Sequence, residues 1–181
     1  LQDLLQAKFG KRVVVFNQGV GGTQAFQLLT GTDGRNRNFA AQMAASKAHI
    51  VIINYLLNDQ HFSVVPTPGM YQETPEMYAS ILGWLAQTAR DNGKQVVFQE
   101  PNPICSEPVP GNIQIFLNSL RTEAALMNVP LVAQYDYIKS LPNWQSMYSS
   151  CSHPFDPLYE IKAKRTFEVV SPIVQWVLSQ P

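Results

Sequence analysis

The sequence predicts an α/β protein with three layers, in which helices cover both faces of a mainly parallel sheet. Short apolar runs alternate along the chain with longer segments of helical periodicity, which is the order of strands joined by helical crossovers. The runs lack a strict alternation of apolar and polar side chains, as expected for strands covered on both faces. A length of 181 residues suits one domain, which we assign to residues 1–181.

Four short apolar runs are the predicted strands. They comprise residues 11–16, 48–55, 95–99 and 131–133. The first of them contains three consecutive valines, and β-branched side chains favour strands. Because parallel strands end at a common edge of their sheet, we expect functional side chains in the loops after residues 16, 55 and 99.

Longer segments between these runs have the spacing of helices. They comprise residues 23–29, 39–47, 74–92, 112–127 and 156–178. The third begins with Thr74 and Pro75, a capping hydroxyl followed by a proline at the first helical position. The chain opens in an amphipathic segment that Gly10 ends, which is typical of the close of a helix.

Composition and charge exclude two classes of function. The chain has 13 basic and 13 acidic residues, a net charge of zero, and no basic run. Nucleic acid binding needs a concentrated positive field, so we expect no nucleic acid partner. No apolar stretch approaches the roughly 20 residues that span a bilayer, so we expect no membrane span.

A glycine-rich segment follows the first predicted strand. Residues 17–23 contain Gly19, Gly21 and Gly22, which allow a tight turn and leave amide N–H groups free to face a ligand. A turn without a ligand is the alternative interpretation. The segment lacks the spacing of a dinucleotide fingerprint, and no Gly-Lys-Ser/Thr follows that would indicate a phosphate-binding loop.

Two further segments carry polar side chains that suit catalysis. Asn58 and Asp59 follow the second predicted strand, where they form either a turn bonded to local backbone or a donor for a developing oxyanion. His153 lies in a short polar loop, directly before Pro154 and the last predicted helix. We expect the other two histidines, His49 and His61, not to be catalytic.

In this order, the three segments resemble motifs of the SGNH (GDSL-type) hydrolase superfamily of esterases and lipases. The matching residues are Asn17, Gly19, Gly22, Asn58, Asp59, His153 and Pro154. The similarity covers almost the whole chain, because the order of strands and helices also fits. The resemblance implies a flavodoxin-like parallel sheet whose first strand is missing from this chain.

The resemblance also implies a serine esterase mechanism that acts on a small, lipid or acetylated-carbohydrate ester. In such a mechanism a histidine serves as general base, and amide donors stabilise the oxyanion. Carried onto this sequence, His153 is the base, and the Gly22 N–H and the Asn58 side chain are oxyanion donors. No metal or organic cofactor is implied.

Three positions depart from the family pattern. The sequence contains no Gly-Asp-Ser motif, and we expect the nucleophilic serine and the first strand upstream of Leu1. Ser150 occupies the place of the usual aspartate three residues before the histidine, which leaves Asp136, Asp156 or a Ser-His dyad as alternatives. Leu56 replaces a glycine two residues before Asn58.

Cys105 and Cys151 are the only cysteines. From the sequence they are either two unrelated buried residues or one disulfide between two loops. If the chain has the fold that the resemblance implies, both lie at the active edge of the sheet. A disulfide there would attach the His153 loop to the loop after residue 99 and favour a secreted or periplasmic protein.

Two other functions are compatible with the same motifs. A non-catalytic binding or assembly module on this fold would explain why both the serine and the aspartate are missing. An acyltransferase would use the same residues while excluding water. The residues that precede Leu1 distinguish hydrolysis from the binding module.

Overall fold

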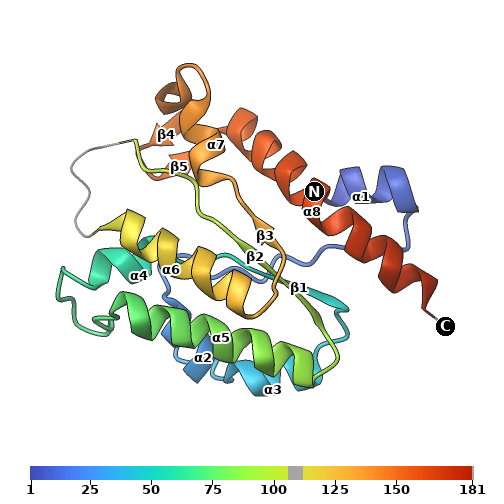
Figure 1. Ribbon diagram of the computed structural model, residues 1–181, viewed down its shortest axis with the longest axis horizontal. Coiled ribbons are helices and arrows are strands. Elements are labelled where there is room, and N and C mark those ends of the chain that lie inside the picture. Colours follow the sequence, from blue (N-terminus) through green and yellow to red (C-terminus); the bar gives the residue numbers. More distant parts are fainter. Residues whose placement is uncertain (106–111, 181) are drawn as a thin grey trace. The chain divides into compact units, whose positions relative to one another are not determined.

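The computed structural model describes residues 1–105 and 112–180 of the chain. Figure 1 labels the elements, which in chain order are α1 (Gln2–Phe9), α2 (Ala25–Thr30), α3 (Phe39–Ala45), β1 (Ile50–Ile53), α4 (Leu57–Phe62), α5 (Pro75–Asp91), β2 (Gln95–Gln99), α6 (Ile113–Leu126), β3 (Leu131–Val132), α7 (Tyr135–Ser140), the 3-10 helix η1 (Trp144–Met147), β4 (Tyr148–Ser150), β5 (His153–Pro154) and α8 (Asp156–Ser179). The described residues form two compact units. The first contains residues 1–19, 102–105 and 132–180, and the second contains residues 20–101 and 112–131.

The main sheet has the strand order β1-β2-β3. β1 and β2 pair in parallel, from Ile50 opposite Gln95 to Ile53 opposite Phe98. The Phe98 N–H donates to the carbonyl of Pro130, directly before β3, over 2.9 Å. Val96, Val97 and Phe98 are buried, as the unbroken apolar run predicts. The predicted α/β class with a parallel sheet is confirmed.

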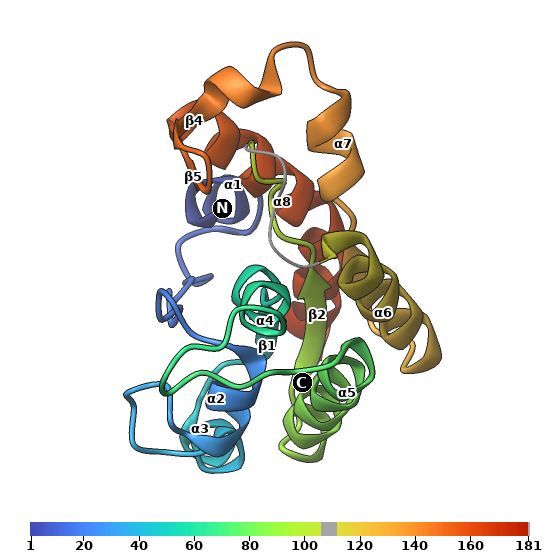
Figure 2. The same cartoon turned by 90° about the vertical axis from the view of Figure 1, so that its left-hand side faces the viewer.

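Helix α5 organises the second unit. It packs against α6, β2, α2 and α3, and the two views in Figures 1 and 2 show α6 lying along it. The Thr74 hydroxyl accepts from the Met77 N–H over 3.2 Å, and Pro75 occupies the first turn, as the sequence predicts. The buried face of the helix comprises Tyr78, Ile81, Leu82, Leu85, Ala86 and Ala89.

The first unit combines its two terminal helices with a small hairpin. α1 packs against α8, and Lys8 Nζ donates to Ser171 Oγ over 2.8 Å. β4 and β5 pair antiparallel with an irregular register between Tyr148 and Ser150. Buried Ile138, Tyr148 and Leu158 form a core cluster under this hairpin. The assignment of residues 1–181 to one domain stays a prediction.

The predicted strand at residues 11–16 is wrong. Among the described residues, no strand pairs with this segment. Its backbone instead bonds locally: the Val13 N–H donates to Gly10 O, and the Val15 N–H donates to the Gln2 side chain. Val14 and Phe16 are 52% and 72% exposed, because a strand is stable only where neighbouring strands bond and cover it.

Two segments predicted as loops contain regular structure. Residues 57–62 form the short helix α4, and the segment around His153 forms the β4-β5 hairpin. Helix α7 was also not predicted. All of these elements are short, so their apolar spacing is too brief to distinguish them from a turn. The predicted loop after residue 99, which we assign to residues 101–111, lies within the described residues only at residues 101–105.

Candidate active site

The glycine-rich segment presents an open backbone amide. The Asn17 side-chain oxygen accepts from the Gly19 N–H over 3.0 Å, which closes a local turn. Gly22 has a φ of 77°, which glycine adopts without strain, while nothing lies within 4 Å of the place a Cβ would take. Among the described residues, the Gly22 N–H donates no hydrogen bond. It is therefore free to serve as a donor.

Asn58 binds the backbone directly after Gly22. It lies in the first turn of α4, and its Nδ2 donates to the carbonyl of Thr23 over 2.9 Å. The Thr23 hydroxyl in turn donates to Val20 O over 2.8 Å. A side-chain amide carries two N–H bonds, so one remains for a ligand. The structure thus places Gly22 and Asn58 around one segment, residues 20–26, which we call the oxyanion loop after the role predicted for these two residues.

The backbone before Asn58 has an unusual conformation. Leu56 has a φ of 158° and a ψ of −42°, and its side chain is only 1% exposed. Few side chains adopt this combination of angles. Its position directly before α4 orients the turn that carries Asn58. The burial also shows that the leucine side chain packs into the core.

Buried polar side chains hold the oxyanion loop from behind. Asp59 Oδ1 accepts from the Ala25 N–H over 2.7 Å, and Glu73 Oε1 accepts from the Phe26 N–H over 3.4 Å. The Gln24 side chain donates to Tyr71 O and accepts from Tyr71 N, each over 2.8 Å. Asp59 and Gln24 are fully buried, and Glu73 is 1% exposed.

Sequence reasoning did not find Glu73 or Gln24. Neither residue belongs to a motif, and each acts through contacts with residues more than 40 positions away, Glu73 with Phe26 and Gln24 with Tyr71. Polar residues between apolar stretches usually indicate an exposed loop. Their burial is a property of the tertiary structure.

The two carboxyl groups behind the loop titrate far from their ordinary range. Burial, together with the charge of Asp59, raises the pKa of Glu73 to about 9. Burial also raises the pKa of Asp59 to about 6, although the hydrogen bond from Ala25 opposes this shift. Near neutral pH, the pair therefore retains one proton, held mainly by Glu73.

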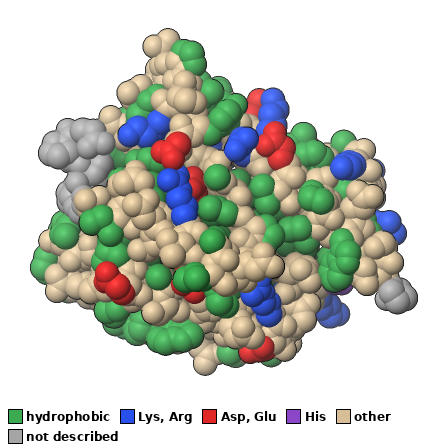
Figure 3. Space-filling model, viewed as in Figure 1, with side chains coloured by type: hydrophobic (Ala, Val, Ile, Leu, Met, Phe, Trp, Pro, Cys, Tyr) green, Lys and Arg blue, Asp and Glu red, His purple; other side chains and the backbone are tan. Residues whose placement is uncertain are grey.

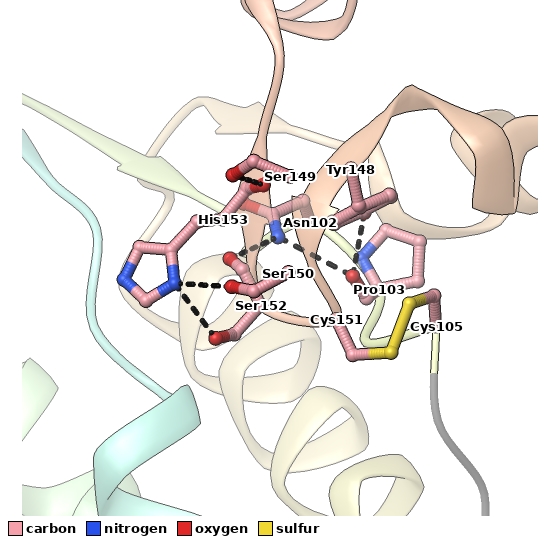
Figure 4. The surroundings of a disulfide bond; sticks show 9 residues. All are labelled: Asn102, Pro103, Cys105, Tyr148, Ser149, Ser150, Cys151, Ser152 and His153. Carbon is pink, nitrogen blue, oxygen red and sulfur yellow. Dashed lines mark hydrogen bonds between the residues drawn. A yellow bond between two sulfur atoms is a disulfide. The ribbon is translucent and has the colours of Figure 1, made fainter.

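His153 lies in the other unit, at the start of β5, and its side chain is exposed. Figure 4 shows its Nδ1 facing two hydroxyls, Ser150 Oγ at 2.8 Å and Ser152 Oγ at 3.1 Å. The Ser149 hydroxyl donates to the backbone carbonyl of His153 over 2.9 Å. Nδ1 is therefore occupied, and among the described residues Nε2 has no partner.

The place of the family aspartate is thus filled by a hydroxyl that contacts the imidazole. Ser150 makes the contact with Nδ1 at the position three residues before the histidine, and Ser152 adds a second. The two carboxylates considered as substitutes belong to helices outside the hairpin. Asp136 is in the first turn of α7, and Asp156 is at the start of α8. A hydroxyl orients an imidazole, but it supplies no charge to balance an imidazolium.

A disulfide and buried hydrogen bonds hold the hairpin that carries His153. Cys105 and Cys151 are bonded to each other, as predicted, with their Cα atoms 4.6 Å apart. The Cys105 N–H donates to Cys151 O over 2.9 Å, and the Tyr148 hydroxyl donates to Pro103 O over 2.6 Å. These contacts attach the hairpin to residues 102–105, as Figure 4 shows.

Asn102 connects the hairpin to helix α8. Its Oδ1 accepts from Lys162 Nζ over 2.8 Å, and its Nδ2 is 3.5 Å from Ser152 O. Asn102 is 5% exposed. Burial lowers the pKa of Lys162 to about 8. Asn102 therefore joins the residue before His153, Ser152, to Lys162 on helix α8.

The described residues contain no cluster of metal ligands and no helix that could span a membrane. No group of three or more metal-type ligands occurs among the described residues. None of the helices in residues 1–105 and 112–180 is apolar over a length that would cross a bilayer. On the face drawn in Figure 3, charged side chains of both signs are scattered among hydrophobic and uncharged ones.

The chain matches no family model and no curated protein by sequence. Its fold matches solved hydrolases. LAE5, an α/β hydrolase from the metagenome of Lake Arreo in Spain, aligns with a TM-score of 0.73 and 16% identity over 93% of this chain and 78% of that one. Axe2, an acetylxylan esterase from Geobacillus stearothermophilus, aligns with a TM-score of 0.72 and 18% identity over 93% and 77%.

A protein named as a GDSL-like lipase, from Parabacteroides merdae, aligns with a TM-score of 0.69 and 20% identity over 93% of this chain and 78% of that one. These matches show that the chain has the α/β fold of SGNH hydrolases, which confirms the predicted resemblance at the level of the fold. The roles of Gly22, Asn58 and His153 stay predictions.

Proposed function

We propose that this chain provides the oxyanion donors and the general base of a serine esterase. The Gly22 N–H and the Asn58 side-chain amide stabilise the oxyanion of the tetrahedral intermediate. His153 Nε2 removes the proton from the nucleophilic serine and later delivers it to the leaving alcohol. The proposal thus assigns catalytic roles to specific residues on the fold that the chain shares with solved hydrolases.

The hydrogen bonding of His153 carries this proposal. A general base needs one ring nitrogen held and the other free to accept a proton. Ser150 and Ser152 occupy Nδ1, and Nε2 has no partner among the described residues. With Nδ1 donating to the Ser150 hydroxyl, the lone pair is on Nε2, where proton transfer requires it.

The nucleophile in this proposal precedes Leu1. The sequence contains no Gly-Asp-Ser motif, and the chain covers 77–83% of several of the solved hydrolases that it matches. The upstream segment would also supply the first strand of the sheet. The substrate is a carboxylic ester, and the similarity to an acetylxylan esterase and to lipases supports an acetylated carbohydrate, a lipid or a small ester.

The hydroxyl partners of His153 favour a second candidate, a non-catalytic binding module of the same fold. A chain without a carboxylate at Nδ1 lacks the group that balances the imidazolium during acylation. The presence of a reactive serine distinguishes the two candidates, because a non-catalytic binding module does not require a nucleophile.

Kinetics on the protein extended upstream of Leu1 test the proposal. We expect hydrolysis of nitrophenyl acetate and of acetylated xylo-oligosaccharides, with loss of activity in His153→Ala. The matched control is His61→Ala, since His61 packs edge-on against Phe62 on α4. Equal activity in His153→Ala and the unaltered protein would reject the assignment of the base.

We further propose that the protein works in an oxidising compartment, either outside the cell or in the periplasm. The Cys105–Cys151 disulfide supports this proposal, because such bonds persist where thiols are not kept reduced. Fractionation of the producing cells should recover the protein outside the cytoplasm. Recovery in the cytoplasm with two free thiols would contradict it.

A further inference from the structure

Two carboxyl groups lie in contact behind the oxyanion loop without a cation to balance them. Asp59 comes from α4, and Glu73 comes from the segment that leads into α5. Their side chains are in hydrogen-bond contact with each other, and each also accepts a backbone N–H of the loop. Neither forms an ion pair with any lysine or arginine among the described residues.

The second oxygen of each carboxyl group lacks a hydrogen-bond partner among the described residues. Asp59 Oδ2 and Glu73 Oε2 are buried, and neither accepts a hydrogen bond from any of the described residues. Two ionised carboxylates would place like charges together in a buried site, which is strongly unfavourable. One proton held by the pair makes one carboxyl group a donor to the other and removes the repulsion.

We propose that Glu73 is a positioning residue of the oxyanion loop, and that its protonated carboxyl donates a hydrogen bond to Asp59. The resulting pair fixes the N–H groups of Ala25 and Phe26, and thereby the turn that presents the Gly22 N–H. The catalytic consequence rests on the proposed esterase function, whereas the proton-dependent support of the loop does not.

The remaining contacts of the loop explain why this support matters. Gln24 is fixed by Tyr71, and Asn58 is bonded to Thr23 O. The loop is thus held at several successive residues, and the carboxyl pair controls two of them. Misplacement of an oxyanion donor by a fraction of an ångström is enough to lower the rate.

The two tyrosines near the pair do not supply the proton near neutral pH. Tyr78 on α5 is fully buried, its hydroxyl donates to Tyr55 O over 2.8 Å, and burial raises its pKa well above the ordinary value. Burial also raises the pKa of Tyr55. Asp33 and Arg35 act on Tyr55, and these two form an ion pair with each other. His61 lies on α4, beside Phe62.

Amide hydrogen exchange on this chain tests the support directly. Where opening of the loop releases Glu73 into water, the protection factors of Ala25 and Phe26 fall by about tenfold per pH unit between about pH 6 and about pH 8, after correction for intrinsic exchange. The reason is that the closed loop keeps a proton that the open loop loses. Ala41 is the internal control, because its N–H bonds to the Asn38 side chain, which does not titrate.

Two variants isolate the proton, and a third controls for charge. In Glu73→Gln a side-chain amide replaces the protonated carboxyl as the donor to Asp59, so protection should persist without the pH dependence. Asp59→Asn supplies the donor from the other side and should give the same result, which covers a failure of the first variant to fold. Glu76→Gln changes an exposed carboxylate on α5 and should retain the dependence of the unaltered chain.

Kinetics on the upstream-extended protein test the catalytic consequence of this positioning role. We expect Glu73→Leu to lower kcat by about tenfold or more with little change in KM, and Glu73→Gln to restore most of it. An inactive protein with the expected exchange behaviour would refute the esterase and leave the positioning role standing. Protection that is independent of pH in the unaltered chain, or a slope that persists in Glu73→Gln, would overturn the role of Glu73.

Discussion

The two halves of the proposed machinery are stabilised in different ways. The oxyanion loop is backed by buried side chains, where Gln24, Asp59 and Glu73 each contact backbone far away in sequence. The His153 side chain is exposed, and its hairpin is held by a disulfide at Cys151, two residues before the histidine, in addition to the hydrogen bonds of Tyr148 and Asn102.

This difference matches what each half does in the proposed reaction. Oxyanion donors act only when they are fixed before the charge develops, and burial provides that rigidity. A base must exchange protons with the substrate and with water, so it needs exposure together with a fixed orientation. A disulfide restricts the hairpin while leaving the imidazole accessible.

Removal of the base should produce the largest effect. In the upstream-extended protein, we expect His153→Ala to lower kcat by roughly 10³-fold or more, because proton transfer to and from the serine is lost. Steady-state hydrolysis of nitrophenyl acetate measures it. A decrease of less than about tenfold would show that His153 is not the base.

Removal of the oxyanion donor should have the second-largest effect. We expect Asn58→Ala to lower kcat by about 10²–10³-fold, the usual loss for one such donor. Asn54→Ala is the matched control, because Asn54 also donates to backbone, at Gln99 O and Glu100 O. Equal losses in the two variants would mean that Asn58 acts only in folding.

Removal of the disulfide should affect stability. We expect Cys105→Ser combined with Cys151→Ser to lower the free energy of unfolding by about 2–4 kcal/mol, since the bond closes a long loop. Urea unfolding followed by fluorescence measures the change. On denatured, unreduced protein we expect no titratable thiol, and two thiols would contradict the bond.

The hydroxyls around Nδ1 should show the smallest effect. We expect Ser150→Ala to lower kcat by about fivefold, the value of one neutral hydrogen bond, because Ser152 remains as a partner. Ser150→Asp should raise kcat above that of the unaltered protein, because a carboxylate stabilises the imidazolium. A loss of activity in Ser150→Asp would show that the hairpin excludes a charge there.

Long elements with clear end signals could be predicted from the sequence. Helix α5 follows from the capping hydroxyl of Thr74, the proline after it and the apolar spacing of Ile81 and Leu85. Strand β2 (Gln95–Gln99) follows from the unbroken apolar run Val96 to Phe98. The same kind of run failed at Val13 to Phe16, because the identity of a segment does not show whether a neighbouring strand is present to pair with it.

The site residues that belong to sequence motifs could be predicted. Gly22, Asn58 and His153 were found because glycine, amide and imidazole suit particular chemical tasks. The contact between Ser150 and His153 was left open among alternatives, because it depends on a two-residue hairpin turn. Glu73 was missed, since its proximity to Asp59 arises from the packing of α2, α4 and the start of α5.

Covalent labelling of the upstream-extended protein with a fluorophosphonate tests the central claim most directly. Mass spectrometry of the labelled peptide identifies the reactive residue. The esterase proposal predicts one labelled serine upstream of Leu1 and loss of labelling in His153→Ala. No labelling, or labelling of a serine within residues 1–181, would contradict it.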